Sequence, residues 1–181
     1  MKGNNMKTLD LVYIALGAVL IAVCTWLSIP AAVPFTMQTF AVFCVLRILG
    51  GKRGLAAILV YLLLGAAGLP VFSGFRAGFG AILGTTGGYM VGFIFIGLIY
   101  WLAEALLDKK LWIEITAMAL GLLVMYAFGT AWFMAVYART SGAVGVGTAL
   151  TWCVLPFIVP DLVKMALAVV LSHRVRKAIG L

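Results

Sequence analysis

The sequence predicts an all-α fold, an integral membrane bundle of six transmembrane helices, and three observations support this prediction. Of the 181 residues, 65% are hydrophobic and 10% are charged, whereas an average soluble domain carries about 25% charged residues. A soluble core of this length cannot bury so much apolar surface, so the lipid bilayer has to solvate most of it. Six spans of about 20 residues each account for about 120 positions, close to the apolar content. The composition therefore excludes a soluble enzyme, a secreted disulfide scaffold and a disordered chain, and residues 1–181 are expected to form a single transmembrane domain.

The first three expected helices end at turns. The first covers residues 9–29, and a turn that contains Pro30 and Pro34 but no charge follows it. The second covers residues 35–49 and stops at a Gly-Gly-Lys-Arg sequence, and the third covers residues 54–68. Because neither of these two reaches 20 residues, each is expected to start deep in the membrane or to be completed by non-helical backbone that the protein shields from lipid.

The last three expected helices are longer. The fourth covers residues 86–107, and the fifth covers residues 111–138, long enough to tilt or to protrude. The sixth ends in the basic tail that begins at His173. Two outer connections are long for simple turns: residues 69–88, rich in glycine, are expected to fold back against the protein, and residues 139–151 are expected to form a flexible lid.

The basic residues predict the orientation in the membrane. With the N-terminus inside, the outer connections hold Arg76 and Arg139, and Lys164 lies within a span. The other ten basic residues flank the inner ends of the spans: Lys2, Lys7, Arg47, Lys52, Arg53, Lys109, Lys110, Arg174, Arg176 and Lys177. Ten against two is a strong positive-inside bias, and an even number of spans returns the tail to the same side. We therefore expect a multi-pass protein of the cell membrane with both termini in the cytoplasm, and the net charge of +8 does not indicate nucleic-acid binding.

Asp161 and Lys164 are the strongest candidates for a binding site, because ionisable groups within a membrane span are costly. They are three residues apart, so a helix places them on one face, roughly 18 and 14 Å from His173 at about 1.5 Å per residue. Pro156 and Pro160 precede the pair and favour a helix that is broken or begins there. The pair either fixes helix packing by self-neutralisation or forms a buried polar site for a small ligand, and the two prolines favour the ligand site.

Other polar and small residues have two interpretations each. Arg76 suits a carboxylate through two parallel hydrogen bonds, although an outer arginine can equally contact lipid headgroups. The amide of Gln38 can bind a ligand or a neighbouring helix, and the position of Tyr89 at the start of a span favours an interfacial anchor. In the first span, Ala18 and Ala22 form a small-xxx-small pattern that serves either internal packing or an external partner.

Several chemistries have no support in the sequence. The phosphate-binding motif GxxxxGK[ST] is absent, so the chain is not expected to use ATP by itself. The single histidine lies in the basic tail, which leaves neither a metal cluster nor a Ser-His pair. We therefore expect no cofactor, no metal and no enzyme activity; a membrane-embedded enzyme would rest on Asp161 and Lys164 alone.

Three segments resemble the BioY family, the biotin-specific substrate-binding subunits (S components) of energy-coupling factor (ECF) transporters. The first is Pro-Phe-Thr-Met-Gln-Thr at 34–39, and the second is the glycine-rich loop 68–80 with the Gly-Thr-Thr-Gly-Gly-Tyr sequence at 84–89. The third is Pro-Asp-Leu-Val-Lys at 160–164. The resemblance extends over nearly the whole chain.

This resemblance implies an outward-facing pocket for biotin, formed by Gln38, Gly74, Arg76, Gly80, Tyr89, Asp161 and Lys164. Asp161 and Lys164 would meet the ureido ring and Arg76 the carboxylate, or the ligand would lie the other way round. The resemblance also implies that a transmembrane coupling protein contacts Ala18 and Ala22 and that two cytoplasmic ATPases drive transport. The alternative is an autonomous proton-coupled carrier in which Asp161 is the proton site and Lys164 its counter-ion.

Overall fold

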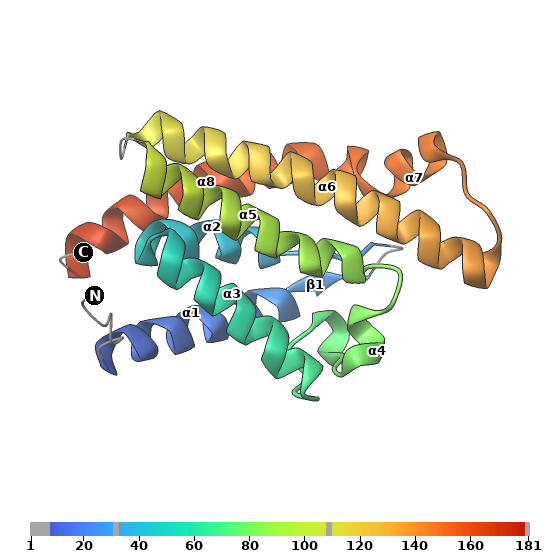
Figure 1. Cartoon of the computed structure of the whole chain (residues 1–181), viewed down its shortest axis with the longest axis horizontal. Helices are drawn as coiled ribbons and strands as arrows, with labels where there is room; N and C mark the ends of the chain where they lie inside the picture. The colour runs from blue at the N-terminus through green and yellow to red at the C-terminus, as the bar shows by residue number, and fades with distance from the viewer. Residues whose placement is uncertain (1–7, 31–32, 108–109, 180–181) are drawn as a thin grey trace.

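The architecture is a bundle of long helices with small elements gathered at one end, in a computed structural model that describes residues 8–30, 33–107 and 110–179. Within these residues, six helices have twelve residues or more (Figure 1): α1 (Thr8–Trp26), α2 (Gln38–Leu49), α3 (Gly51–Ala66), α5 (Gly87–Leu106), α6 (Leu111–Ser141) and α8 (Leu155–Ile179). The smaller elements are the antiparallel strands β1 (Ser28–Ile29) and β2 (Phe35–Thr36), the 3-10 turn η1 (Ser73–Phe75) and the short helices α4 (Phe79–Ile82) and α7 (Val146–Cys153). We call this the loop end; the opposite end, where α1 begins and α8 ends, is the terminal end.

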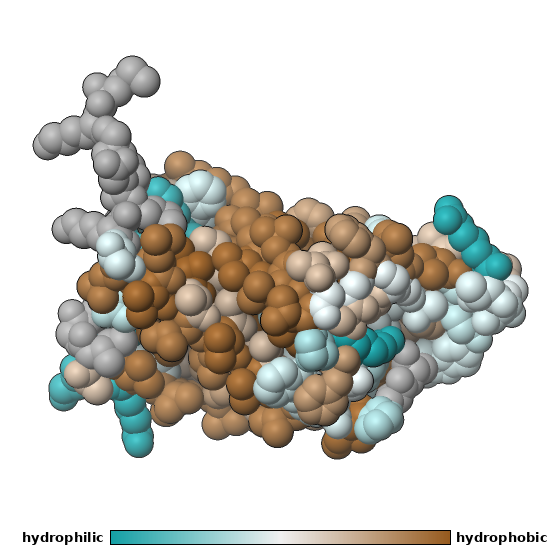
Figure 2. Space-filling view, turned by 90° about the horizontal axis from the view of Figure 1, so that it is seen from below, coloured by the Kyte–Doolittle hydropathy of each residue, from teal (hydrophilic) through white to brown (hydrophobic). Residues whose placement is uncertain are grey.

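The all-helical membrane class predicted from composition is confirmed. Four segments are long and apolar enough to cross a membrane, namely α1, α5, α6 and the run Val146–Ala178 that contains α7 and α8. The helices α2 and α3 have 12 and 16 residues, so they fall short of a full span, as expected. Figure 2 shows the matching surface: apolar residues fill the middle of the face, and most hydrophilic residues lie toward its two ends.

The helices α5 and α6 pack closely because glycines on each helix receive large side chains from the other. A Cβ atom on Gly88 or Gly92 of α5 would lie 2.3 or 2.5 Å from a side-chain atom of α6. In return, a Cβ atom on Gly129 of α6 would lie 2.3 Å from the ring of Tyr89. Small residues at such contacts let membrane helices approach, and here they fix the position of Tyr89.

Charged side chains cross-link the terminal end. Arg53 Nη2 of α3 lies 2.6 Å from Asp10 Oδ1 of α1, and Glu104 of α5 accepts a 2.5 Å hydrogen bond from the Gly51 backbone at the start of α3. Seven of the ten cations assigned to the inner side lie at this end, whereas Lys2, Lys7 and Lys109 lie outside the described residues. The charge pattern thus separates the two ends of the fold.

A second ion pair, at the same end, is buried. Arg47 Nη2 of α2 lies 2.9 Å from Glu114 Oε2 of α6, with 6% and 15% of the two side chains exposed. Arg47 also donates a 3.3 Å hydrogen bond to the Val169 carbonyl of α8. This pair therefore joins α2, α6 and α8 toward the terminal end of the bundle.

Three predictions about loops and helix ends can be compared with the fold. The glycine-rich loop folds back as expected: Phe72 is buried, and its ring occupies the space that a side chain on Gly65 would need. The segment 139–151 is not a wholly flexible lid, because α6 continues to Ser141 and α7 begins at Val146. The helix break expected near the prolines lies at Val154, between α7 and α8.

Candidate functional site

A cavity toward the loop end is the candidate binding site. It lies among α2, α5, α6 and α8, beneath the β1–β2 hairpin and the loop that carries η1. Five residues singled out from the sequence line it together: Gln38, Arg76, Tyr89, Asp161 and Lys164. The fold therefore gathers side chains that are up to 126 positions apart in the chain, as counted from 38 to 164.

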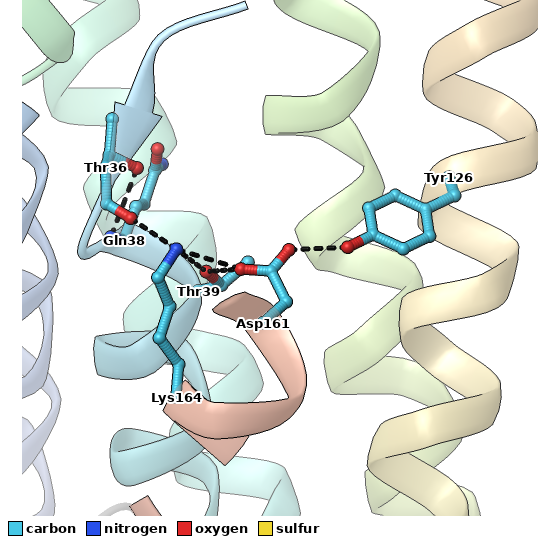
Figure 3. Close-up of polar contacts among 6 residues, drawn as sticks. All are labelled: Thr36, Gln38, Thr39, Tyr126, Asp161 and Lys164. Atoms are coloured by element: carbon cyan, nitrogen blue, oxygen red, sulfur yellow. Dashed lines mark hydrogen bonds and ion pairs between the residues drawn. The ribbon is translucent and has the colours of Figure 1, made fainter. Parts of the chain in front are cut away.

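Asp161 and Lys164 form the polar centre of the cavity (Figure 3). Both are on α8, one turn apart, and Lys164 Nζ lies 2.9 Å from Asp161 Oδ1. Only 4% and 6% of the two side chains remain exposed. The break at Val154 starts the new helix α8 ahead of the pair. Pro156 lies in the first turn of α8, where a backbone N–H has no intrahelical acceptor, so the missing N–H of proline costs no hydrogen bond.

Three other segments donate to or accept from this pair. Asp161 accepts hydrogen bonds from Thr39 of α2 at 2.8 Å and from Tyr126 of α6 at 2.6 Å. Lys164 donates to the Thr36 carbonyl of β2 at 2.7 Å and to Thr39 Oγ1 at 3.3 Å. The pair does fix helix packing, as one interpretation held, and it also faces a cavity, as the other required.

Thr39 and Tyr126 were not among the residues selected from the sequence. Thr39 lay inside the segment 34–39 that carried the family resemblance, next to Gln38. Tyr126 lies near the middle of the 31-residue helix α6, away from both ends. Because tyrosines of membrane helices gather at the interfaces, its central position was the signal that it has a buried partner.

Gln38 binds a neighbouring helix, and it also lines the cavity. It is 6% exposed and lines the cavity, and its Nε2 donates a 3.0 Å hydrogen bond to Tyr61 of α3. The Tyr61 hydroxyl lies 3.3 Å from Thr25 of α1, which donates to the Ile21 carbonyl. This chain of hydrogen bonds fixes the amide relative to α1 and α3.

Tyr89 is part of the cavity wall and not an interfacial anchor. It is 8% exposed, and its hydroxyl lies 3.0 Å from Thr130 Oγ1 of α6. The anchor interpretation was wrong because the start of α5 is covered by the loop end of α6, where Trp132 packs on Gly88.

Arg76 lies at the mouth of the cavity. The residue is exposed, and its Nε donates a 3.1 Å hydrogen bond to the Ser73 carbonyl, which orients the guanidinium. The loop is held against α1 by Trp26, whose Nε1 donates to the Pro70 carbonyl at 2.9 Å and whose ring stacks on Phe75 at 5.4 Å. A carboxylate at the mouth would meet a positioned arginine.

Gly74 and Gly80 are exposed and are not among the described residues that line the cavity. Gly74 has a φ of 69°, which permits the tight turn before Arg76. A Cβ atom on Gly80 would meet nothing within 4 Å. The structure thus gives Gly74 a role in the loop that presents Arg76, and it brings neither glycine to the cavity.

Ala18 and Ala22 do not form an external surface. They are 2% and 6% exposed and belong to the core of the bundle. Beside them, a Cβ atom on Gly17 would lie 3.0 Å from Ala57 of α3. Internal packing is therefore a role that the fold gives to this small-residue pattern, and the contact of these two alanines with a partner stays a prediction.

The cavity has the chemistry of a binding site. Among the described residues, no group of three or more His, Cys, Asp and Glu side chains could hold a metal ion. One acid, two cations, an amide and several hydroxyls face a wall of apolar side chains that includes Met90, Phe93 and Phe157. Such a site suits a small, partly apolar molecule with several hydrogen-bonding groups.

The comparisons with known proteins agree with this description. The model of the BioY family matches residues 1–181. The chain is 38% identical over 172 residues to a probable biotin transporter BioY of Pyrococcus horikoshii, covering 94% of this chain and 98% of the relative. It is 36% identical over 159 residues to the biotin transporter BioY of Thermotoga maritima, covering 87% and 90%.

A solved structure shares the fold. The crystal structure of an S-component for biotin from an ECF-type ABC transporter superposes with a TM-score of 0.81 at 28% sequence identity, covering 98% of this chain and 95% of the other. The full-length family match and the two relatives point to the same family as this likeness. The chain therefore belongs to the BioY family and has the fold of an S component.

Proposed function

We propose that this chain captures biotin at the outer face of the cell membrane, as the S component of an ECF-type ABC transporter. The observation that carries the proposal is the buried Asp161–Lys164 pair, which lines a cavity together with Gln38, Tyr89 and Arg76. The names of its relatives and of the solved structure supply the ligand.

The groups of biotin match the groups of the cavity. The ureido ring has two N–H donors and a carbonyl acceptor, which correspond to the Asp161 carboxylate and the Lys164 ammonium. The bicyclic ring body corresponds to the apolar wall that includes Met90 and Phe93. The carboxylate of the valeryl chain corresponds to Arg76 at the mouth, which places the ring inward and the tail outward.

The proposed topology has six transmembrane helices and cytoplasmic termini. Four segments meet the length of a span, and α2 and α3 complete the six with the help of the hairpin and the glycine-rich loop at their outer ends. The cations at the terminal end support its placement in the cytoplasm. The loop end, with the mouth of the cavity, then faces outward.

Delivery of biotin inward is proposed to require other chains. The sequence has no ATP-binding motif of the GxxxxGK[ST] type. A transmembrane coupling protein and two cytoplasmic ATPases would supply the energy, as the family resemblance implies; the similar structure is named as an S-component from an ECF-type ABC transporter. The contact of Ala18 and Ala22 with the coupling protein, which the family resemblance implies, remains part of this proposal, although only 2% and 6% of the two residues are exposed in the chain alone.

Titration of the purified chain with biotin tests the capture step. In detergent or nanodiscs, isothermal titration calorimetry is expected to give one site with a Kd below micromolar. Binding that is absent or weaker than micromolar would remove the vitamin-receptor function. Biotin methyl ester, which lacks the carboxylate charge, is the matched ligand and is expected to bind the wild-type chain more weakly than biotin. In the Arg76→Gln variant, this difference in affinity between the two ligands is expected to disappear.

Uptake by proteoliposomes tests the need for partners. Vesicles that contain this chain alone, with a proton gradient and without ATP, are expected to accumulate no labelled biotin. Accumulation under these conditions would instead establish the autonomous proton-coupled carrier.

A further inference from the structure

A second hollow, which we call the vestibule, lies at the loop end beside the cavity. Aromatic side chains from four elements line it: Phe133 and Tyr137 of α6, Trp152 of α7, Phe157 of α8 and Phe35 of β2. Phe133 stacks on Tyr137 with ring centroids 5.3 Å apart, and Tyr137 meets Trp152 edge to face at 6.2 Å. The vestibule thus has a continuous aromatic wall along α6 and α7.

The vestibule and the cavity share a wall that includes one pair of aromatic rings, Phe35 and Phe157. Val33 and Phe157 line both hollows, so the two spaces share a wall. Phe157 stacks on Phe35 with ring centroids 6.1 Å apart and planes 24° apart. On the cavity side, Lys164 Nζ lies 4.2 Å from the centroid of the Phe35 ring, a cation–π contact. The stacked pair is therefore in contact with the polar centre of the cavity.

The lining of the vestibule selects for an uncharged ring. The hydroxyl oxygens of Thr140 and Thr151, whose hydrogens are donated to backbone carbonyls of α6 and α7, provide acceptors among the aromatic side chains, and Thr85 adds a third hydroxyl. No acidic or basic side chain is among the described residues that line it. Aromatic faces and hydroxyls bind a planar or bicyclic ring with polar edges, whereas a free ion would find no partner of opposite charge.

We propose that the vestibule is a second, transient binding subsite that holds the ureido bicycle of the ligand before it passes the Phe35–Phe157 pair into the cavity. This inference rests on the proposed function for the identity of the ligand. Its location follows from the shared wall, the position at the outer end and the neutral aromatic lining. Binding is then a two-step process in which an encounter complex precedes the final complex.

The kinetics of biotin binding to the full chain in nanodiscs test the two steps. In stopped-flow measurements, the observed rate is expected to rise with biotin concentration and then to saturate. The plateau is expected because the passage from the encounter complex to the final complex does not depend on biotin concentration. A fast change of tryptophan fluorescence is expected to precede the slow phase and to disappear in Trp152→Phe. The matched control is Trp112→Phe, at the terminal end, which is expected to keep the fast phase. A single phase whose rate stays linear in biotin concentration overturns the proposal.

Filling the vestibule tests its place on the route. Thr151 is exposed on α7 and lines the vestibule, so Thr151→Trp is expected to lower the association and dissociation rate constants together by about tenfold. Their ratio, the Kd, stays unchanged, since an obstacle on a route slows passage in both directions. The matched control is Val146→Trp, on the same helix but facing the groove between α6 and α8, with unchanged rate constants.

The outcomes separate this inference from the proposed function. If the wild-type chain does not bind biotin at equilibrium, the proposed function and the subsite both fail. If it binds biotin but Thr151→Trp leaves both rate constants unchanged, or changes the dissociation rate alone, only the subsite fails. If Thr151→Trp does not fold, the saturation measured with the wild-type chain still decides the question.

Discussion

Asp161 is the residue on which three helices converge. Its carboxylate receives hydrogen bonds from Thr39 of α2, Tyr126 of α6 and Lys164 of its own helix, α8. Charge-assisted hydrogen bonds of this kind are about twice as strong as neutral ones, and low exposure strengthens them further. One side chain therefore sets both the ligand-facing charge and the relative positions of α2, α6 and α8.

Replacing either member of the central pair is expected to weaken biotin binding. Asp161→Asn removes the charge that accepts from the ligand, and Lys164→Met removes the donor, so each raises the Kd by roughly 5- to 150-fold, equivalent to about 1–3 kcal/mol. Isothermal titration calorimetry on protein that remains monodisperse measures the change. Asp10→Asn, which removes a carboxylate at the terminal end, is the control and leaves the Kd unchanged. Unchanged affinity in both site variants would show that the pair only holds helices together.

Among the residues of the site, the charged side chains could be identified from the sequence more readily than the hydroxyl-bearing ones. Asp161 and Lys164 stood out because a charge in an apolar run has few explanations. Thr39 carries no such signal, and the central position of Tyr126 indicates a buried partner without identifying it, since both roles depend on which helix face meets α8. For the same reason the position of Tyr89 favoured an anchor, and only the family resemblance placed it in the pocket: its burial depends on α6, which begins more than twenty residues later in the chain.

Helix α5 depends on α6 for its alignment, through the glycines that each presents to the other. Gly129→Ala is expected to destabilise the protein by about 1–3 kcal/mol, because the new methyl group would overlap the ring of Tyr89. The variant should unfold at a lower temperature by intrinsic fluorescence and bind biotin more weakly. Gly147→Ala, at a position of α7 with nothing within 4 Å, is the matched control and keeps both properties. Equal behaviour of the two variants would contradict the close packing of α5 and α6.

Removing one partner of the ion pair between α2 and α6 is expected to destabilise the protein more than replacing both partners by apolar residues. Arg47→Met leaves Glu114 without its counter-ion and costs about 3 kcal/mol, whereas the double variant Arg47→Met with Glu114→Leu recovers most of this loss. Thermal unfolding of the three proteins in the same detergent measures the difference. A double variant less stable than the single one would mean that the pair stabilises the bundle by itself. The recovery is expected because, among described residues, Arg47 Nε and Glu114 Oε2 lack hydrogen-bond partners of good geometry.

The order and extent of the long helices could be predicted, and the short elements could not. The second helix was expected to end at residue 49 and does so, because Gly50 with a φ of 81° follows it. The helix α7 was missed because its glycines at 145 and 147 predict a linker, while packing against α6 and α8 supplies the order. The pattern at Ala18 and Ala22 marks a close helix contact, but spacing alone does not say whether the neighbour belongs to the same chain.

For the whole molecule, the distribution of charge predicts the orientation in the membrane. A green fluorescent protein fused after Leu181 is expected to fluoresce, and alkaline phosphatase fused at that position is expected to be inactive, because the proposed orientation places the tail in the cytoplasm. Alkaline phosphatase inserted after Gly142, at the loop end, is expected to be active. The reverse pattern would place the mouth of the cavity in the cytoplasm and overturn the proposed direction of capture.

The membrane class, too, was accessible from composition alone, because bilayer thickness and apolar content leave few solutions for a chain of this length. The depth of the cavity and the presence of a second hollow were not. Both are lined by residues from several elements that are far apart in the chain, and no local pattern records how those elements meet.

The three N–H bonds of the Lys164 ammonium have a consequence for the protein before any ligand arrives. Acceptors on Thr36, Thr39 and Asp161 engage all three of them. The protein itself therefore leaves no bare ammonium within its apolar bundle, and the fold does not depend on a ligand to pair this charge. An arriving molecule gains only the difference between its own contacts and those it displaces, so discrimination among similar compounds rests on how well each one replaces the Thr36 carbonyl or the Thr39 hydroxyl.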